Sequence, residues 1–209
     1  SDPRALSTGS ARLRPCRTIV TLWLLACALP AVAVPLVFRA DGPASRGLAR
    51  QFQTVWNEHG QGLVAALVPA DTPLDTVQCL ILPTDAFQRY FGDRLPDWGV
   101  GAAVPSGRLI AVDHQRLPVV GPGAETLFLH EMTHALLFQA AGEARLPTWL
   151  HEGAAMRASG EWRFRDTVAV ALSGRVPTLQ RLDGPFPRGG AGADMAYRTS
   201  LAAVLFLDR

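Results

Sequence analysis

The chain has 209 residues, 20 basic and 18 acidic side chains and a formal net charge of +2, and this length allows one domain with a hydrophobic core. Residues 1–33 hold four of the arginines and one aspartate, so the rest of the chain carries 16 basic against 17 acidic side chains, a net charge of −1. A nearly neutral body gives no electrostatic reason to expect a nucleic-acid partner.

Residues 18–38 contain no charged side chain and follow a segment that carries four arginines. A secretory signal peptide has this order of a positive region and an apolar core, and cleavage after the Ala-Val-Ala at residues 31–33 would suit it. The alternative is an uncleaved signal anchor that uses all of residues 18–38, which are about enough to cross a bilayer. In both interpretations the positive flank stays in the cytoplasm, and residues 1–38 export a domain at residues 39–209.

The exported part opens with a short linker and a helix. Residues 39–45 contain Pro, Gly and Ser and are typical of a linker, whereas residues 46–59 have the apolar spacing of an amphipathic helix. We expect Gly60 and Gly62 to end this helix. Residues 63–69 are apolar and ambiguous, and they are compatible with the same helical layer.

A strand and a short helix follow. Residues 76–82 predict a strand that stops at Pro83, and Cys79 within this run is the only cysteine after residue 33. No disulfide within the domain is therefore possible, and the apolar run indicates a packed core thiol. Residues 84–91 predict a short helix capped by Thr84, with Tyr90 on its apolar, core-facing side.

Two further strands are expected before the most informative motif. Residues 99–104 and 108–112 flank a Pro-Ser-Gly turn, which indicates a hairpin, and residues 113–123 form a loop rich in Pro and Gly. A helix, several short strands of mixed order and further helices predict an α+β layer arrangement.

The motif lies in residues 125–139 (ETLFLHEMTHALLFQ), whose apolar character and lack of Gly and Pro predict a buried helix. This run contains HExxH. Residues four apart share one face of a helix, so His130 and His134 can bind one metal ion, and Glu131 can act as general base on a water there. The alternative is a helix with two unrelated histidines.

A second helix is expected at residues 147–156, with Pro147 at its start and Thr148 as a possible cap. Catalytic zinc usually takes three protein ligands and keeps one position open. Glu152 offers the missing carboxylate, and the neighbouring His151 is a chemically competent rival. Because neighbours on a helix point about 100° apart, only one of them can face the two histidines.

This segment resembles the gluzincin metallopeptidases, specifically the peptidase MA-like family, which joins HExxH to a W-[LF]-x-E-G-x-A segment. The matching residues are Trp149, Leu150, Glu152, Gly153 and Ala155. The resemblance implies a zincin-like domain with a small mixed sheet and an HExxH helix, and it implies Glu152 as the third zinc ligand. It also implies that the last strand before that helix, residues 108–112, borders the cleft and pairs with a peptide substrate. The alternative is a covered strand without a substrate role.

The C-terminal residues follow less clear patterns. Residues 161–171 have no recognisable pattern, residues 184–193 are typical of a flexible loop, and residues 194–207 predict a helix with Asp194 as its cap. The family resemblance implies that Tyr197 stabilises the oxyanion of the reaction, and a Tyr packed at a helix start is the alternative. Because the chain stops within an apolar helical pattern, we expect a domain that is truncated at its C-terminus.

One position departs from the wider gluzincin pattern. Thermolysin-like enzymes carry a carboxylate four residues after the glutamate ligand, where it orients a histidine. Met156 occupies this position here. Asp194, Asp113 or backbone carbonyls are the candidates that replace it.

The sequence thus predicts an exported, Zn²⁺-dependent gluzincin peptidase that acts on peptides or proteins. Zinc is expected on His130, His134 and Glu152, with Glu131 as general base and Tyr197 as oxyanion donor. The alternatives are a membrane-tethered binding or assembly module that keeps the zincin fold without turnover, and a zinc hydrolase that does not act on peptides. The oligomeric state does not follow from the sequence.

Overall fold

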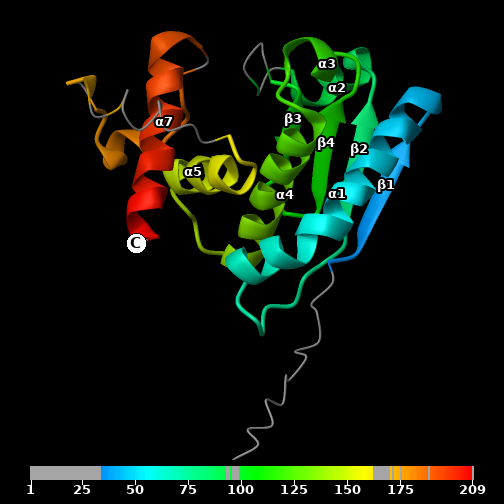
Figure 1. Ribbon diagram of the computed structural model, residues 1–209, viewed down its shortest axis with the longest axis horizontal. Coiled ribbons are helices and arrows are strands. Elements are labelled where there is room, and N and C mark those ends of the chain that lie inside the picture. The colour runs from blue at the N-terminus through cyan, green and yellow to red at the C-terminus, as the bar shows by residue number, and fades with distance from the viewer. Residues whose placement is uncertain are drawn as a thin grey trace, which may run out of the picture. The chain divides into compact units, whose positions relative to one another are not determined.

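The computed structural model describes residues 34–92, 95, 99–161, 170, 172–174, 176–187 and 189–208. These residues form an α+β fold with one mixed four-stranded sheet and six α-helices, which confirms the predicted α+β class (Figure 1). Most of the predicted leader, residues 1–33, lies outside the described residues. No helix in the part of the chain that the structure describes is both long and apolar enough to cross a membrane.

The sheet has the strand order β1-β2-β4-β3. Its strands are β1 (Leu36–Ala40), β2 (Val77–Leu82), β3 (Gly101–Ala103) and β4 (Leu109–Asp113). The first three in spatial order are parallel, and the short β3 pairs antiparallel with β4 at one edge. The predicted hairpin and the strand around Cys79 are confirmed, and Cys79 is fully buried.

Strand β1 was not predicted. The sequence pattern places residues 36–38 in the leader and residues 39–45 in a linker, but Leu36–Ala40 pair with β2 and Val34 is buried in the core. The apolar character of this strand merges in the sequence with that of the segment before it, so composition alone does not separate the two.

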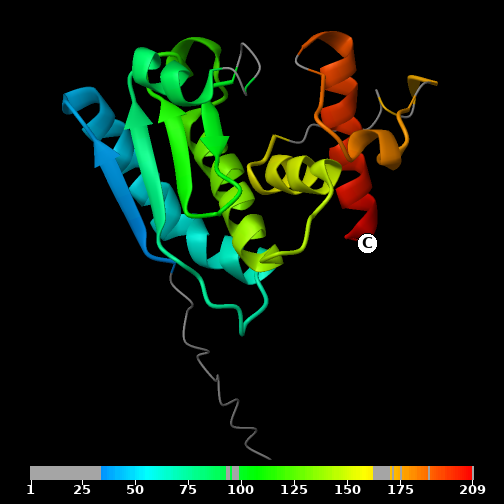
Figure 2. The same ribbon diagram turned by 180° about the vertical axis from the view of Figure 1, so that it is seen from behind.

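Two long helices cover one face of the sheet. These are α1 (Pro43–Leu67) and α4 (Ala124–Ala141), which lie on the same side of the sheet (Figure 2). They pack against each other through Phe52 and Phe128, whose stacked rings have centroids 4.7 Å apart. The expected end of α1 at Gly60 and Gly62 is wrong. The ring of Trp56 covers Gly60, and a Cβ there would approach Trp56 Cδ2 to 2.6 Å, so this glycine serves packing within the helix.

The opposite face carries α2 (Thr84–Phe91), which matches the predicted helix. Phe87 is fully buried there, but Tyr90 is 63% exposed, so its expected place in the core is wrong. Tyr90 lies on the solvent side of the helix. The expected Thr84 cap is also wrong, because its hydroxyl donates to the Asp113 carboxylate at 2.9 Å. The loop between β4 and α4 contains a short helix, α3 (Leu117–Val120).

The C-terminal helices form a separate layer beside α4. They are α5 (Thr148–Ala158), the 3-10 helix η1 (Leu179–Leu182) and α7 (Gly190–Leu207). Helix α5 packs against both α4 and α7, and so lies between the sheet-covering helix and the last helix (Figure 1). Pro147 precedes α5 as expected, but Thr148 makes no capping bond. Helix α7 starts earlier than predicted, so Asp194 lies inside it and does not cap it.

Candidate metal centre

The two histidines of the HExxH motif lie on one face of α4, as their spacing predicts. Their Nε2 atoms are 3.1 Å apart, and both side chains are largely buried, with 16% and 12% exposure for His130 and His134. The helix is apolar on nearly all sides, because it packs on the sheet, on α1 and on α5. The buried helix thus holds the two ring nitrogens facing one point.

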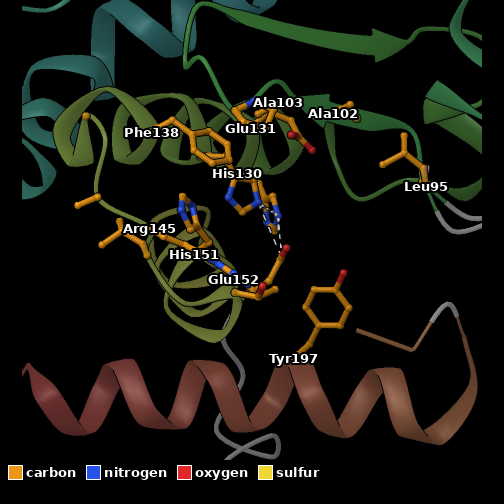
Figure 3. A pocket seen from close by; sticks show the side chains of 18 residues that line it. Leu95, Ala102, Ala103, His130, Glu131, Phe138, Arg145, His151, Glu152 and Tyr197 are labelled. Atoms are coloured by element: carbon orange, nitrogen blue, oxygen red, sulfur yellow. Dashed lines mark hydrogen bonds and ion pairs between the residues drawn. The ribbon is translucent and has the colours of Figure 1, made fainter. Parts of the chain in front are cut away.

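Glu152 completes a triangle of possible ligands from α5. Its Oε2 lies 3.6 Å from His130 Nε2 and 3.7 Å from His134 Nε2 (Figure 3). In a tetrahedral zinc site with bonds of about 2.0–2.1 Å, two ligand atoms are about 3.3 Å apart. The three donor atoms, which all lie within 4.8 Å of one another, therefore have spacings suited to one metal ion. These geometric facts hold for any small divalent cation with a preference for nitrogen and oxygen ligands.

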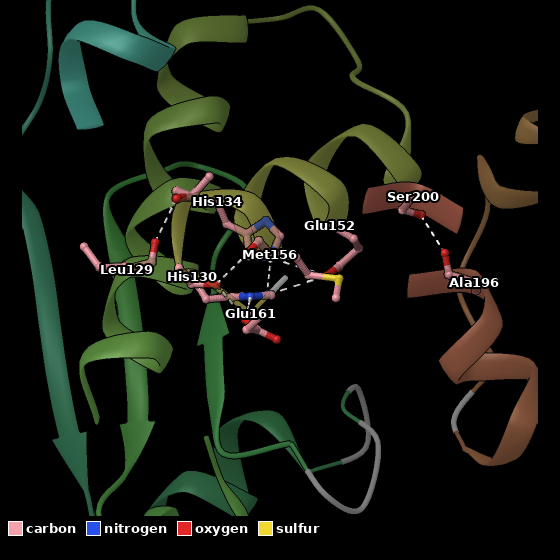
Figure 4. Close-up of polar contacts among 10 residues, drawn as sticks. Leu129, His130, His134, Glu152, Met156, Glu161, Ala196 and Ser200 are labelled. Atoms are coloured by element: carbon pink, nitrogen blue, oxygen red, sulfur yellow. Dashed lines mark hydrogen bonds and ion pairs between the residues drawn. The ribbon is translucent and has the colours of Figure 1, made fainter. Parts of the chain in front are cut away.

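Gly153 explains how α5 brings Glu152 to this place. A Cβ at Gly153 would approach the backbone oxygen of Ser200 to 2.4 Å, so α5 and α7 touch at this residue. The Ser200 hydroxyl donates to the carbonyl of Ala196 in its own helix at 2.8 Å (Figure 4). The glycine beside Glu152 therefore has a packing role.

His151, the rival ligand, turns away from the triangle. Its ring packs on Phe138, with centroids 4.5 Å apart, and it is only 8% exposed. Its Nδ1 is buried without a hydrogen-bond partner among the described residues. Burial lowers the pKa of His151, so the ring is neutral near pH 7. The structure thus places Glu152, and not His151, with the two histidines.

Glu161 contacts the outer nitrogen of His130, and sequence reasoning missed this residue. Its Oε1 lies 2.7 Å from His130 Nδ1 and accepts a hydrogen bond of 2.8 Å from the Ser159 hydroxyl (Figure 4). A carboxylate in this position fixes the tautomer that leaves Nε2 free for a metal. Glu161 therefore orients His130. Met156 occupies the position of the orienting carboxylate in thermolysin-like enzymes, but its side chain has no carboxylate to accept this hydrogen bond.

Neither aspartate proposed for that role approaches the histidines. The Oδ1 atom of Asp113 is buried at the end of β4, where it accepts hydrogen bonds from the backbone N–H groups of Gln115 and Arg116. Asp194 pairs with Arg198 on the exposed side of α7. Asp113 therefore fixes the loop after β4, and this expectation is wrong for both residues.

The protonation of the metal-free site follows from burial and close charges. Burial opposes the charged form of His130, but hydrogen bonds with Glu152 and Glu161 outweigh it and raise its pKa well above the ordinary value. Burial lowers the pKa of His134 to about 4. His134 is therefore ready to bind a cation as the neutral ring, whereas His130 must first release a proton.

Glu131 faces the same cavity and is 6% exposed. Burial raises the pKa of this carboxyl to about 7 in the metal-free protein. Gly101 of β3 makes room for it, because a Cβ there would lie 2.4 Å from Glu131 Oε1 and 2.8 Å from Leu127 Cδ1. The edge strand and the helix therefore hold Glu131 between them.

The cavity measures about 530 Å³ and is bounded by α4, α5 and β3. Strand β3 lines it through Gly101, Ala102 and Ala103, and none of the described residues of β4 does so. The expectation that residues 108–112 border the cleft is therefore wrong, because β4 is an inner strand with β2 on one side and β3 on the other.

Tyr197 reaches the cavity from α7, beside Glu152 (Figure 3). Its ring packs edge to face on Phe186, with centroids 5.1 Å apart. Burial and the nearby carboxylates of Glu152 and Glu131 raise the pKa of its phenol, so the hydroxyl keeps its proton and remains a donor. The residue is therefore both packed and placed at the site.

Comparison of the chain with protein-family models, with curated proteins and with solved structures found no match.

Proposed function

We propose that the protein is a zinc-dependent peptidase with a zincin-like domain of the gluzincin type. The observation that carries this proposal is the triangle of His130, His134 and Glu152, next to the buried carboxyl of Glu131 in one cavity. A metal site that only stabilises a fold has no need of a general base, and zinc in such sites usually takes four protein ligands. Two imidazoles and one carboxylate match the set that leaves one position open.

A bound zinc ion would supply Lewis acidity toward a carbonyl and an activated water at neutral pH. Glu131 would take a proton from the attacking water and return it to the leaving amine. Burial raises the pKa of Glu131, and a nearby cation would lower it again, so the carboxyl could both accept and release a proton near neutral pH. Tyr197 would donate its phenolic hydrogen to the carbonyl oxygen as negative charge develops there.

The edge strand supports a peptide as the substrate. The outer side of β3 has no strand partner among the described residues and lines the cavity. An extended peptide can add to such an edge through main-chain hydrogen bonds. The small side chains of Ala102 and Ala103 leave room for it to approach.

We further propose that the domain is exported. Cleavage after residue 33 would leave β1 intact, because its first paired residue is Leu36. An anchor that used all of residues 18–38 would instead remove residues from the sheet, so a cleaved signal peptide, or a shorter anchor, agrees better with the fold. Amino-terminal sequencing of secreted protein and a carbonate wash of membranes distinguish them, and a folded, active cytoplasmic pool with its leader intact would contradict export.

The test of the function combines metal content with hydrolysis of a quenched peptide library. We expect one zinc per chain, retained in Glu131→Gln, with hydrolysis reduced by at least about 10²-fold. Zinc binding should be much weaker in Glu152→Ala than in the wild type, and His151→Ala should retain its zinc. Zinc binding without hydrolysis in the wild type would instead indicate a binding module, and hydrolysis of non-peptide substrates alone would indicate another hydrolase.

A further inference from the structure

One end of the cavity holds side chains that the proposed reaction does not use. We call Phe138, Arg145 and His151 the distal group. All three line the cavity, and Figure 3 shows them on one side of His130, with Leu95 on the opposite side. Phe138 belongs to the last turns of α4, Arg145 to the connection after it and His151 to α5. The group thus joins three segments at one point.

Arg145 has a guanidinium that is available to a ligand. The residue is exposed and makes no hydrogen bond or ion pair with any residue that the structure describes. Some other arginines of the domain are paired, such as Arg108 with Asp75 and Arg157 with Asp208, but Arg145 alone among the described arginines lines this cavity. A guanidinium offers a planar set of donors that matches a carboxylate.

His151 gives a second and independent sign of a missing partner. Its ring is 8% exposed and lines the cavity, yet no described residue forms a hydrogen bond with it, and Nε2 is the ring nitrogen that is not fully buried and can meet a ligand. Buried polar groups normally have a partner, because an unsatisfied one costs free energy. The ring of Phe138 packs against the imidazole at an interplanar angle of 38° and holds it in place before any ligand arrives.

The charges of the cavity differ between its two ends. Glu131 and Glu152 lie at the centre, and Arg145 is the only arginine among the described residues that line the cavity. A zinc ion bound at the centre would offset these two carboxylates, whereas at the distal group the guanidinium of Arg145 attracts a carboxylate on a ligand. An acidic group is therefore the chemistry that this end of the cavity suits.

We propose that the distal group is a subsite for an acidic side chain of the substrate, on the N-terminal side of the cleaved bond. This inference rests on the proposed peptidase function. Arg145 binds the carboxylate, His151 supplies one further hydrogen bond, and Phe138 contacts the methylene groups of the side chain.

The direction of the peptide follows from the direction of β3. Gly101 lies beside Glu131, and a Cβ at Gly107, just after the strand, would lie 2.6 Å from Gln139 Cγ. The strand therefore runs along α4 toward its C-terminal end and toward Arg145. Antiparallel pairing is the more stable kind. A peptide that pairs antiparallel with β3 thus has its N-terminal residues at the distal group.

The first test uses quenched octapeptides built on one alanine-rich sequence. A single Glu is moved from position to position, and a matched set carries Gln. We expect kcat/KM to be about 5- to 20-fold higher for Glu at one position N-terminal to the cleaved bond, between the effects of an exposed ion pair and of a charge-assisted hydrogen bond. Arg145→Glu should abolish this preference and favour Lys at the same position.

Arg50→Glu is the matched control. It makes the same change of charge on an exposed arginine of α1, which does not line the cavity, and should keep the wild-type preference. An unchanged preference in Arg145→Glu would overturn the proposal. So would a preference that depends on Arg145 but disappears when the C-terminus of the peptides is amidated, because Arg145 would then bind the terminal carboxylate.

The second test measures binding and needs no turnover. Zinc-loaded Glu131→Gln protein, with and without Arg145→Glu, is titrated calorimetrically with the best Glu octapeptide and its Gln counterpart, or with the full sets if nothing is cleaved. Tighter binding of Glu that Arg145→Glu removes supports the subsite, even if the wild type cleaves no peptide and the peptidase function fails. Cleavage without any Glu preference in either assay supports the peptidase function and overturns the subsite. Absence of cleavage and of preference overturns both.

Discussion

Replacement of Glu161 by alanine tests whether this residue orients a metal ligand. Its carboxylate lies 2.7 Å from His130 Nδ1, a short distance typical of a charge-assisted hydrogen bond. Loss of such a partner typically weakens metal binding about 10- to 100-fold, and we expect this range at pH 8 for Glu161→Ala. Glu161→Gln should lie at the lower end, because the amide oxygen still accepts from Nδ1–H.

The pH dependence separates orientation from proton competition. Glu161 also raises the pKa of His130, and a proton on that ring competes with the metal. Removal of Glu161 therefore relieves competition at low pH, so the loss of affinity should be smaller at pH 6 than at pH 8. Competition with a zinc-binding dye measures both values, and circular dichroism checks the fold of each variant.

Asp194→Asn is the control for this experiment. Asp194 lines a second cavity of about 370 Å³ together with Glu161, but it pairs with Arg198 and not with a histidine. The same negative charge is thus removed close to the site without loss of a ligand contact. Wild-type affinity in Glu161→Ala at pH 8, or an equal loss in Asp194→Asn, would refute the orienting role.

Three further predictions concern the same site. Gly101→Ala should displace Glu131, lower hydrolysis with zinc retained and cost about 1–3 kcal/mol of stability. The control Gly62→Ala, whose Cβ meets no atom within 4 Å, should change neither hydrolysis nor zinc content, and equal hydrolysis by the two variants would contradict the prediction. Tyr197→Phe should lower kcat by about 10- to 1,000-fold with little change in KM or zinc content, and a wild-type rate would make it a packing residue. Zinc affinity, titrated from pH 8 to 5.5, should fall about tenfold per pH unit below the raised pKa of His130, and a flat profile to pH 6 would contradict that protonation.

The part of the site that sequence reasoning found depends on local geometry. A helical period places His130 and His134 on one face, and the same period separates Glu152 from His151 by about 100°. Both inferences need only the chain within one or two turns of a helix. The structure agrees with each of them.

The parts that sequence reasoning missed depend on contacts between distant segments. Glu161 meets His130 across 31 residues, and its own segment has no periodic pattern to place it. The family resemblance implies that the last strand before the HExxH helix, residues 108–112, borders the cleft. In the sheet, β3 precedes β4 in the chain but lies outside it as the edge strand, and no residue of the hairpin predicts this order.

Helix α5 stands between two layers, and this position has a thermodynamic consequence. The donors of one possible ion come from two packed helices, two from α4 and one from α5, and α5 in turn packs on α7. An ion bound there would act as a removable cross-link between the sheet-bearing part of the chain and its C-terminal helices. Ligands that bind only the closed arrangement stabilise it by RT ln(1 + [L]/Kd). The availability of metal would then control how often the C-terminal helices open, and with it their exposure to other proteases.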